Sequence, residues 1–358
     1  MTGLAINGRF LTQRMTGVQR FATEIVAAAD ALAARGAWPK ARLLCPPGAR
    51  DAGLAAFAAE AVGRRRGQAW EQLDLPRALG GDFLLNLGNT APLLTGAGQA
   101  VVIHDAGAFD TPESYSFAFR TWYRALQRGL ARRGARLVTV SEFSRGRIAA
   151  ALGVAPETIG VVPESGEHML RIAADEGVLA RCGLEAGRYA LVVGNPAAHK
   201  NLAALTAAAD VLGRHGLRLA LAGAADPAVF RAGGGAAAEA ARGLGRVSDA
   251  ELRALYAHAL CLVFPSRYEG FGLPPLEAMT CGCPVVAARA GAVPEVCGEA
   301  ALWFDPAEPA TLAEAMTRLI GEEGLGDALR AAGLARAAAF TWERAAREML
   351  ALIRDRIT

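Results

Sequence analysis

Short apolar runs alternate with longer helical patterns along this chain, and the alternation starts again after residue 183. Apolar runs separated by helical stretches are typical of parallel strands covered by helices. The first half predicts strands at 4–7, 42–45, 83–87, 101–104, 137–140 and 160–163. The second half predicts strands at 189–194, 217–223, 261–264, 284–288 and 301–304. The predicted fold class is therefore α/β, with two Rossmann-like doubly wound domains.

The length also favours two domains, because a chain of 358 residues exceeds the size at which one hydrophobic core keeps growing. We expect an N-terminal domain at 1–170 and a C-terminal domain at 183–340, joined by a polar stretch. The last segment, 341–358, has an amphipathic helical pattern. We expect this helix to pack back on the N-terminal domain.

The composition is that of a folded α/β protein, with 53% hydrophobic and 20% charged residues. The formal net charge of +3 is too small to indicate nucleic-acid binding. No uncharged run is long enough to span a membrane, and no signal-peptide pattern opens the sequence. These features predict a cytoplasmic protein.

The first 170 residues carry an excess of basic side chains, part of which lies in the segment 119–136. There Arg120, Arg124, Arg128 and Arg132 recur every four residues, with aromatic residues between them. One interpretation is a solvated arginine face whose aromatic side chains pack inward. The other is a basic helix that lies on an anionic membrane or a lipid phosphate.

The six cysteines form no CxxC pair, and the close pair Cys281 and Cys283 lacks further ligands at zinc-like spacing. We therefore expect reduced, buried thiols and no metal site.

The stretch PSRYEGFGLPPLEAM, residues 265–279, places Glu269 and Glu277 on either side of two glycines and two prolines. It follows a predicted strand, and a helix is predicted to begin at one of the prolines. Gly270 and Gly272 let backbone amides approach a phosphate at that helix start. Carboxylates accept hydrogen bonds from hydroxyl groups. The pattern therefore predicts a nucleoside diphosphate sugar, with one glutamate near each sugar.

EGFGLPPLEAM, followed by GCPVVAARAGAVPEVCGEAALWFDP, closely resembles the E(x7)E signature of family 4 glycosyltransferases. These are retaining enzymes with the GT-B fold, in which two Rossmann-like domains face a central cleft. The resemblance implies that Glu269 touches the donor sugar and that Glu277 binds the ribose hydroxyls. It also assigns donor binding to the intervening residues Gly270, Phe271, Gly272 and Leu273.

A second matching loop, NPAAHKN at 195–201, contains Lys200, one of two lysines in the chain. The resemblance places this lysine on the donor diphosphate, where an ammonium neutralises charge on the leaving group. An arginine that the family often has earlier in this loop is absent. Asn195 and His199 are the nearest polar residues, and Asn195 is a candidate donor contact.

Three further positions match the family. In VVIHDAGAF, His104 corresponds to a histidine that faces the donor sugar. Gly17 corresponds to a glycine loop whose backbone faces the diphosphate and the acceptor, and the backbone near Val247 corresponds to a contact with the base. For His104 and Gly17, a structural residue at a strand end and a plain turn remain alternatives. In VVPESGEHM, Glu164 and Ser165 replace the usual asparagine and glycine.

No DxD motif occurs, so we expect no metal cofactor. The resemblance implies cleavage of the bond between the anomeric carbon and the diphosphate, with retention of configuration. Domain closure is expected to complete the site.

Two other classes of protein remain open, namely a dinucleotide-dependent oxidoreductase and a non-catalytic sugar-binding protein. This sequence lacks the GxGxxG motif that is expected of such an oxidoreductase.

The opening segment LAINGRFLTQRMTGVQRFATEI resembles the N-termini of bacterial transferases that add mannose- or rhamnose-type sugars to surface polysaccharide. It therefore favours a GDP-sugar as donor, with UDP- and dTDP-sugars as alternatives. The expected acceptor is a lipid-linked saccharide at the inner membrane face, as in lipopolysaccharide synthesis.

Overall fold

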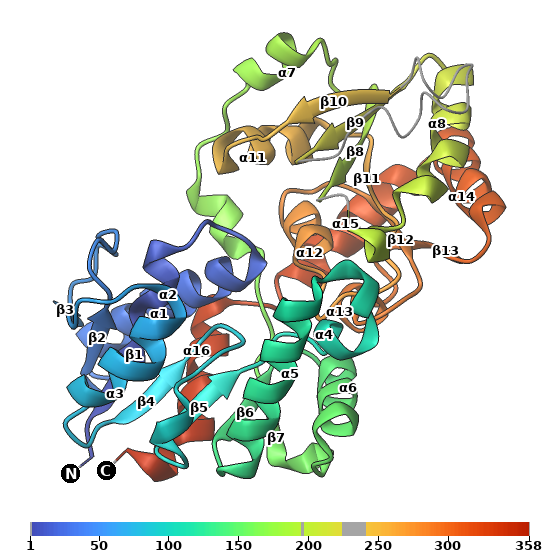
Figure 1. Cartoon of the computed structure of the whole chain (residues 1–358). Helices are drawn as coiled ribbons and strands as arrows, with labels where there is room; N and C mark the ends of the chain where they lie inside the picture. The colour runs from blue at the N-terminus through green and yellow to red at the C-terminus, as the bar shows by residue number, and fades with distance from the viewer. Residues whose placement is uncertain (1, 195–196, 224–240, 358) are drawn as a thin grey trace. The chain divides into compact units, whose positions relative to one another are not determined.

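The computed structural model describes residues 2–194, 197–223 and 241–357 (Figure 1). The chain divides into two compact units. Unit 1 comprises Met1–Glu164 and Thr341–Thr358, and unit 2 comprises Ser165–Phe340. The chain thus passes into unit 2 after Glu164 and returns after Phe340. Residues 165–182, from the polar stretch between the two predicted sheets, belong to unit 2.

Unit 1 contains a parallel sheet with the strand order β3-β2-β1-β4-β5-β6-β7. Its strands are β1 Leu4–Asn7, β2 Ala41–Cys45, β3 Ala58–Ala61, β4 Phe83–Asn86, β5 Gln99–Val102, β6 Arg136–Thr139 and β7 Ile159–Val161. Its helices are α1 Gly17–Ala34, α2 Gly67–Ala69, α3 Leu75–Ala78, α4 Gly107–Asp110, α5 Phe117–Arg132, α6 Glu142–Leu152 and α16 Trp342–Ile353. The order reverses between β1 and β4, which makes this the switch point of the sheet.

Unit 2 contains a second parallel sheet with the order β10-β9-β8-β11-β12-β13. Its strands are β8 Tyr189–Val193, β9 Arg218–Ala222, β10 Ala241–Gly245, β11 Cys261–Phe264, β12 Val285–Ala288 and β13 Leu302–Phe304. Its described helices are α7 Gly177–Cys182, α8 Leu205–Arg214, α11 Asp249–His258, α12 Leu273–Thr280, α13 Val293–Cys297, α14 Pro309–Gly321 and α15 Leu325–Ala337. The switch point of this sheet lies between β8 and β11.

Every predicted strand occurs within two residues of its expected position. The strands β3 and β10 were not predicted from the sequence. Both are edge strands, and most of their residues are exposed or half-buried. Their sequences, AAEA and ARGLG, therefore lack the apolar runs that mark the central strands.

Local capping explains where several helices begin. Helix α11 begins with a capping box, in which the Ser248 side chain accepts from the Glu251 amide and the Glu251 side chain accepts from the Ser248 amide. Ser141 caps α6 in the same position, and Gly153 ends that helix in the left-handed region at φ 68°. Helix α12 begins at Leu273, directly before the two prolines.

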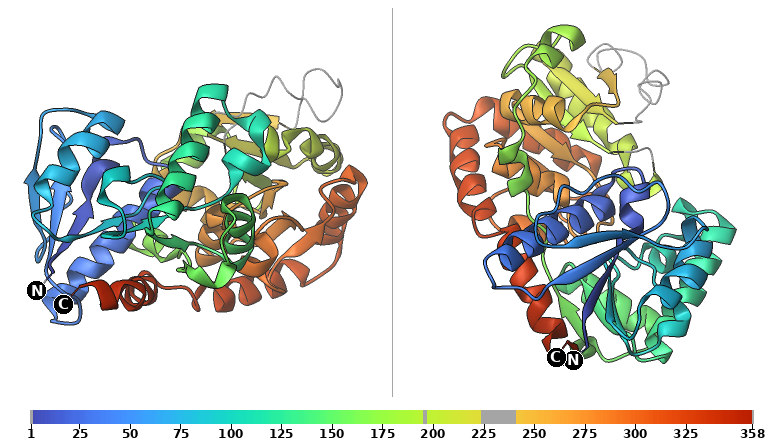
Figure 2. Two further views of the ribbon diagram at one scale, coloured as in Figure 1. Left: turned by 60° about the horizontal axis from the view of Figure 1, so that its bottom comes forward. Right: turned by 90° about the vertical axis from the view of Figure 1, so that its left-hand side faces the viewer.

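The C-terminal helix α16 belongs to unit 1 and packs against α1. Its first residue, Trp342, is 1% exposed, and its ring meets the Phe21 ring of α1 with centroids 6.0 Å apart. Both chain ends lie side by side at the same edge of this unit (Figure 2). Unit 1 therefore depends on a segment that follows the whole of unit 2 in sequence.

We predict that Trp342→Ala lowers the free energy of unfolding by about 3–5 kcal/mol, because it removes a large, fully buried side chain. The measurement is urea unfolding followed by circular dichroism. Trp122→Ala is the matched control, since Trp122 is 39% exposed and its loss should cost no more than about 0.5 kcal/mol. Equal effects of the two changes would contradict this account of α16.

Candidate active site

The loops that follow β8 and β11 meet at the switch point of unit 2, because the carboxyl ends of neighbouring parallel strands lie at one edge of the sheet. Lys200 belongs to the loop after β8, and Glu269 belongs to the loop after β11. A backbone hydrogen bond ties the loops together, from the Arg267 amide to the His199 carbonyl at 2.8 Å. Two segments about 70 residues apart in sequence therefore form one site.

Lys200 and Glu269 contact each other directly. The Lys200 Nζ donates to Glu269 Oε1 at 2.6 Å, and the two side chains are 18% and 15% exposed. The ammonium also lies 5.6 Å from the centre of the Phe264 ring. The structure thus brings together two of the residues predicted to bind the donor, as a charge-assisted ion pair that solvent can still reach.

The backbone of Glu269 is fixed by the turn that follows β12. The Ala292 amide donates to the Glu269 carbonyl at 3.1 Å. Gly291 has φ 60°, and a Cβ there would lie 2.8 Å from the Glu269 nitrogen. Any larger residue at this position would displace the glutamate, so Gly291 supports the position of Glu269.

The predicted donor loop 270–273 combines glycines with buried apolar side chains. Gly272 has φ 110° and precedes the first turn of α12. Phe271 and Leu273 are buried, and the Phe271 ring packs edge-on against Phe340 at 6.1 Å. Their side chains therefore hold the loop in unit 2, while Gly270 is half-buried. Contact of these residues with a donor stays a prediction.

Glu277 lies in α12 and is buried. The His168 Nε2 donates to its Oε1 at 3.0 Å, and the Tyr256 hydroxyl donates to its Oε2 at 3.1 Å. Burial, followed by the nearby Glu277 carboxylate, raises the pKa of Tyr256 well above its ordinary value. Tyr256 therefore remains a hydrogen-bond donor. Glu277 and Glu269 have different partners, and the carboxylate of Glu277 is fixed from two sides.

His104 lies in unit 1, just after β5. Its Nε2 faces the Leu87 carbonyl at 3.1 Å and its Nδ1 faces Glu164 Oε1 at 3.2 Å. Its ring also meets the Phe21 ring edge-on, with centroids 4.9 Å apart. A carbonyl only accepts, so Nε2 carries a proton. The His104 ring and Glu164 are both at least 90% buried and hold each other in place.

The remaining predicted residues are less constrained. Gly17 is the first residue of α1, and a Cβ there would meet no atom within 4 Å. Packing therefore does not require glycine at this position. Val247 is half-buried in the segment that connects β10 to α11. Asn195 lies outside the described residues.

Three functional candidates escaped the sequence reasoning. His168 and Tyr256 orient Glu277, and Glu164 contacts His104. Glu164 carried a sequence signal, since it stands where the family has asparagine. His168 and Tyr256 carried none, because their contacts with α12 arise only from packing within unit 2.

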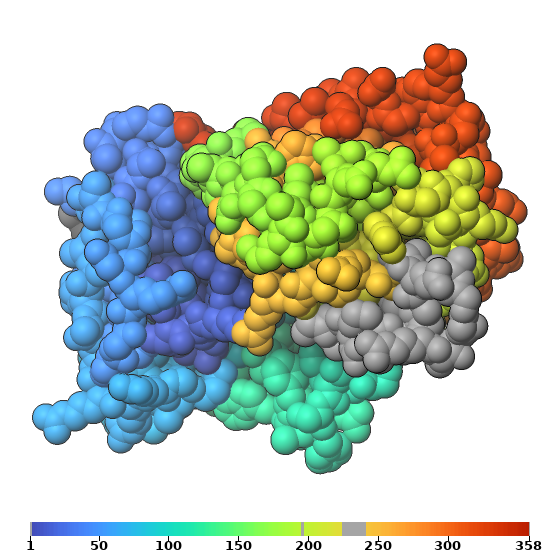
Figure 3. Space-filling model, turned by 90° about the horizontal axis from the view of Figure 1, so that it is seen from above, coloured from blue at the N-terminus to red at the C-terminus, as the bar shows by residue number. Residues whose placement is uncertain are grey.

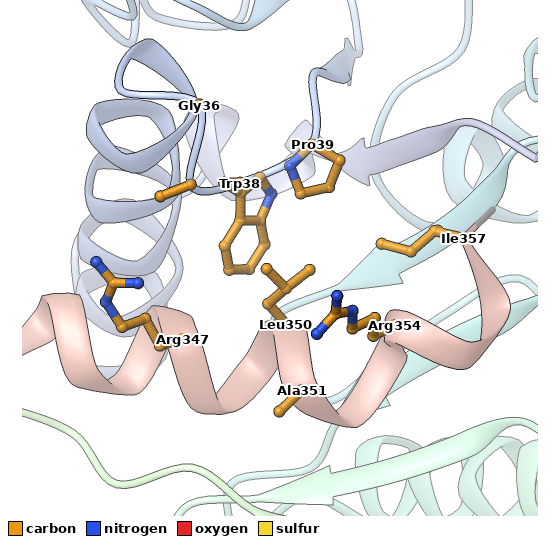
Figure 4. Close-up of a pocket in the computed structure, with 9 residues that line it drawn as sticks. Gly36, Trp38, Pro39, Arg347, Leu350, Ala351, Arg354 and Ile357 are labelled. Atoms are coloured by element: carbon orange, nitrogen blue, oxygen red, sulfur yellow. The ribbon is translucent and has the colours of Figure 1, made fainter.

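A pocket of about 540 Å³ lies in unit 1 at the amino end of β2, away from the strand ends that carry His104 (Figure 4). Trp38 and Pro39 face α16 across it, with Arg347 on that helix and Arg354 directly after its end. It contains none of the predicted site residues.

The basic helix α5 shows features of both interpretations. Leu126 is buried, as inward packing requires. Phe117 and Trp122 are instead 73% and 39% exposed, and this segment, in teal, lies at the molecular surface in Figure 3. The guanidinium groups of Arg124 and Arg128 lie over the Phe109 ring at 5.5 and 5.1 Å. These two arginines therefore help to fix α5 on the unit.

All six cysteines are free, and five are buried. Burial raises the pKa of the Cys261 and Cys297 thiols to about 12 and that of Cys281 to about 11, so these thiols stay protonated.

Within residues 2–194, 197–223 and 241–357, no group of three or more His, Cys, Asp and Glu side chains is arranged to hold a metal ion. No helix in the described part of the chain is both long and apolar enough to cross a membrane.

Comparison with known proteins extends the sequence resemblance. Residues 187–322 match the family described as "Glycosyl transferases group 1". An O-antigen chain mannosyltransferase B from Escherichia coli is 44% identical over 102 residues, which cover 28% of this chain and 27% of that protein. An MMP alpha-(1->4)-mannosyltransferase from Mycolicibacterium hassiacum is 32% identical over 242 residues, covering 65% of this chain and 57% of that protein. The chain thus spans well under two thirds of the length of these relatives.

The likeness of fold extends over the whole chain. The crystal structure of Anabaena HepE in complex with UDP and glucose matches with a TM-score of 0.73 and 18% sequence identity, covering 99% of each chain. This match confirms the predicted fold class, α/β with two Rossmann-like domains.

We predict that Glu164→Ala destabilises the protein by about 1–3 kcal/mol, because it leaves the buried His104 Nδ1 without its partner. Glu164→Gln keeps a hydrogen-bonding group at the same place and should cost less. Urea unfolding measures both changes, with Glu157→Ala at an exposed position of the same unit as control. If Glu164→Ala were as mild as the control, the contact would not stabilise unit 1.

Proposed function

We propose that the protein transfers a mannose- or rhamnose-type hexose from a nucleotide sugar to a saccharide, because residues 187–322 match the glycosyltransferase group 1 family and the fold is that of GT-B structures. The family match favours this class over a dinucleotide-dependent oxidoreductase. The observation that carries the proposal is the Lys200–Glu269 pair at the switch point of unit 2. It offers an ammonium for a diphosphate and, next to it, a carboxylate for sugar hydroxyls.

The proposed donor is GDP-linked. Several relatives are named mannosyltransferases, including the O-antigen enzyme with 44% identity. Mannose supplied from GDP-mannose would also agree with the resemblance of the N-terminal segment. A UDP-sugar is the second candidate, since the HepE structure of the same fold contains UDP and glucose.

In the proposed reaction, Lys200 neutralises the diphosphate as the bond from the anomeric carbon to the diphosphate oxygen breaks. The acceptor oxygen bonds to that carbon from the face that the diphosphate leaves, and its proton passes to the departing diphosphate. Configuration is thereby retained. Glu269 orients the sugar, and no metal ion or other cofactor takes part.

Glu277 is proposed to accept hydrogen bonds from the ribose hydroxyls. Its two oxygens already accept from His168 and Tyr256, but each carboxylate oxygen can accept a further hydrogen bond. The two protein donors would therefore fix the carboxylate in one orientation before the nucleotide binds. The backbone near Val247 remains a proposed contact for the base.

His104 is proposed to face the donor sugar from unit 1, beside the amides near Gly17. Both ring nitrogens have partners in this structure. A sugar hydroxyl would therefore have to replace the contact with Leu87 or with Glu164.

The proposed acceptor is a lipid-linked saccharide at the cytoplasmic face of the inner membrane, in surface polysaccharide synthesis. The exposed aromatic side chains Phe117 and Trp122, next to Arg120 on α5, support a peripheral contact with that membrane. Aromatic side chains enter the lipid interface, and arginines bind its anionic headgroups.

We predict that the protein transfers labelled sugar from GDP-mannose to a lipid-linked saccharide and that Lys200→Ala lowers kcat about 10²–10³-fold. The assay compares GDP-, UDP- and dTDP-sugars as donors. Lys40→Ala removes the other lysine, which is exposed at the amino end of β2, and should leave kcat unchanged. Equal activity of the two variants would contradict the role of Lys200. Absence of transfer from every donor would contradict the proposed function.

We also predict that the protein cosediments with vesicles of phosphatidylethanolamine and phosphatidylglycerol. The double change Phe117→Ala and Trp122→Ala should weaken this binding several-fold, because it removes exposed aromatic area. Leu334→Ala, at a position 46% exposed on α15, is the control. Unchanged binding by the aromatic variant would exclude α5 as the contact surface.

A further inference from the structure

The Lys200–Glu269 contact has a consequence for which ligands the site retains. In the proposed function Lys200 binds the diphosphate and Glu269 binds the sugar, yet here each is the other's partner at 2.6 Å. A ligand therefore binds to charges that already satisfy one another. Its affinity depends on how well it replaces both halves of the pair.

We propose that Glu269 competes with the diphosphate for Lys200, so that the site holds an intact nucleotide sugar more tightly than the nucleoside diphosphate left after transfer. This inference rests on the proposed function and gives the pair a second role, in discriminating substrate from product.

The two ligands differ in what they offer to Lys200 and Glu269. An intact donor brings an anion for Lys200 and hydroxyl groups for Glu269, so both side chains exchange one partner for another. A nucleoside diphosphate brings only the anion. Glu269, with 15% of its side chain exposed, would then lose its ammonium partner and gain only limited contact with water. Leaving a largely buried carboxylate without its partner costs free energy.

The residues around Lys200 and Glu269 favour re-formation of their ion pair when the sugar departs. The Glu269 backbone is held by the Ala292 amide and by the close approach of Gly291. The Lys200 amide donates to the Ala197 carbonyl at 2.9 Å, and the Lys200 ammonium lies over the Phe264 ring. Both ends of the contact therefore start from fixed positions, and little conformational entropy is lost on re-forming it.

Glu277 shows by contrast why Glu269 is suited to this role. Both oxygens of Glu277 accept from donors within unit 2, His168 and Tyr256, which need not leave when a nucleotide binds. The described side-chain partner of Glu269 is the Lys200 ammonium, which is the group that a diphosphate needs. Transfer of the sugar would therefore weaken the hold of the site on the remaining nucleotide through Glu269.

The test is isothermal titration calorimetry of the wild type and Glu269→Gln. The glutamine keeps the shape of the side chain but removes the charge that competes for Lys200. Three probes are titrated: inorganic pyrophosphate, whichever of GDP, UDP and dTDP the wild type binds most tightly, and the corresponding nucleotide sugar. We expect Glu269→Gln to bind pyrophosphate and the nucleoside diphosphate about tenfold more tightly, which is about 1.4 kcal/mol. The preference for the nucleotide sugar over the nucleoside diphosphate should shrink.

Two controls separate this effect from a general change of charge. Glu322→Gln removes the carboxylate of another ion pair in unit 2, between Arg318 of α14 and Glu322 directly after that helix, and should leave all three affinities unchanged. Adding Lys200→Met to Glu269→Gln should abolish the gain, because the gain requires the released ammonium.

Suppose that the wild type binds the nucleoside diphosphate and that Glu269→Gln binds it equally well or more weakly. This result would overturn the inference but leave the proposed function standing. A gain that persists without Lys200 would also overturn it. If the wild type bound no nucleoside diphosphate at all, the proposed function would fail, and the inference would fail with it.

Discussion

The carboxyl ends of neighbouring parallel strands meet at one edge of a sheet, and the candidate site depends on this constraint. At the switch point between β8 and β11, the two connecting loops leave on opposite faces and open a place where their side chains converge. Lys200 and Glu269 meet there although 69 positions separate them. Buried strands on both sides keep the loops in register. The site therefore follows from the topology of unit 2 rather than from any single loop.

The second feature is that the titratable candidates Glu277 and His104 are each held by partners of their own unit. Glu277 is oriented by His168 and Tyr256, and His104 by Leu87 and Glu164. Such partners fix a side chain before a ligand arrives and so reduce the entropy lost on binding. The cost is that a ligand must accommodate or replace them. This applies most directly to Lys200 and Glu269, which hold each other.

Much of the fold could be predicted because its central strands are buried on both faces and so read as apolar runs, as CLVF at β11 does. The edge strands β3 and β10 could not, since their residues face solvent. Lys200 and Glu269 were identifiable from loops that follow strands, but their ion pair was not. Partners such as Tyr256 depend on packing between elements, which no local pattern encodes. Glu164 stood out only as a departure from the family, and its contact with His104 gives that departure a physical meaning.

The central claim is that Lys200 and Glu269 bind the two halves of a nucleotide sugar. A crystal structure of the protein with GDP-mannose tests it most directly. We predict a diphosphate oxygen within hydrogen-bonding distance of the Lys200 ammonium, with a sugar hydroxyl on the Glu269 carboxylate and the ion pair opened. A bound nucleotide sugar whose diphosphate lies elsewhere, with the pair of Lys200 and Glu269 still closed, would contradict the account.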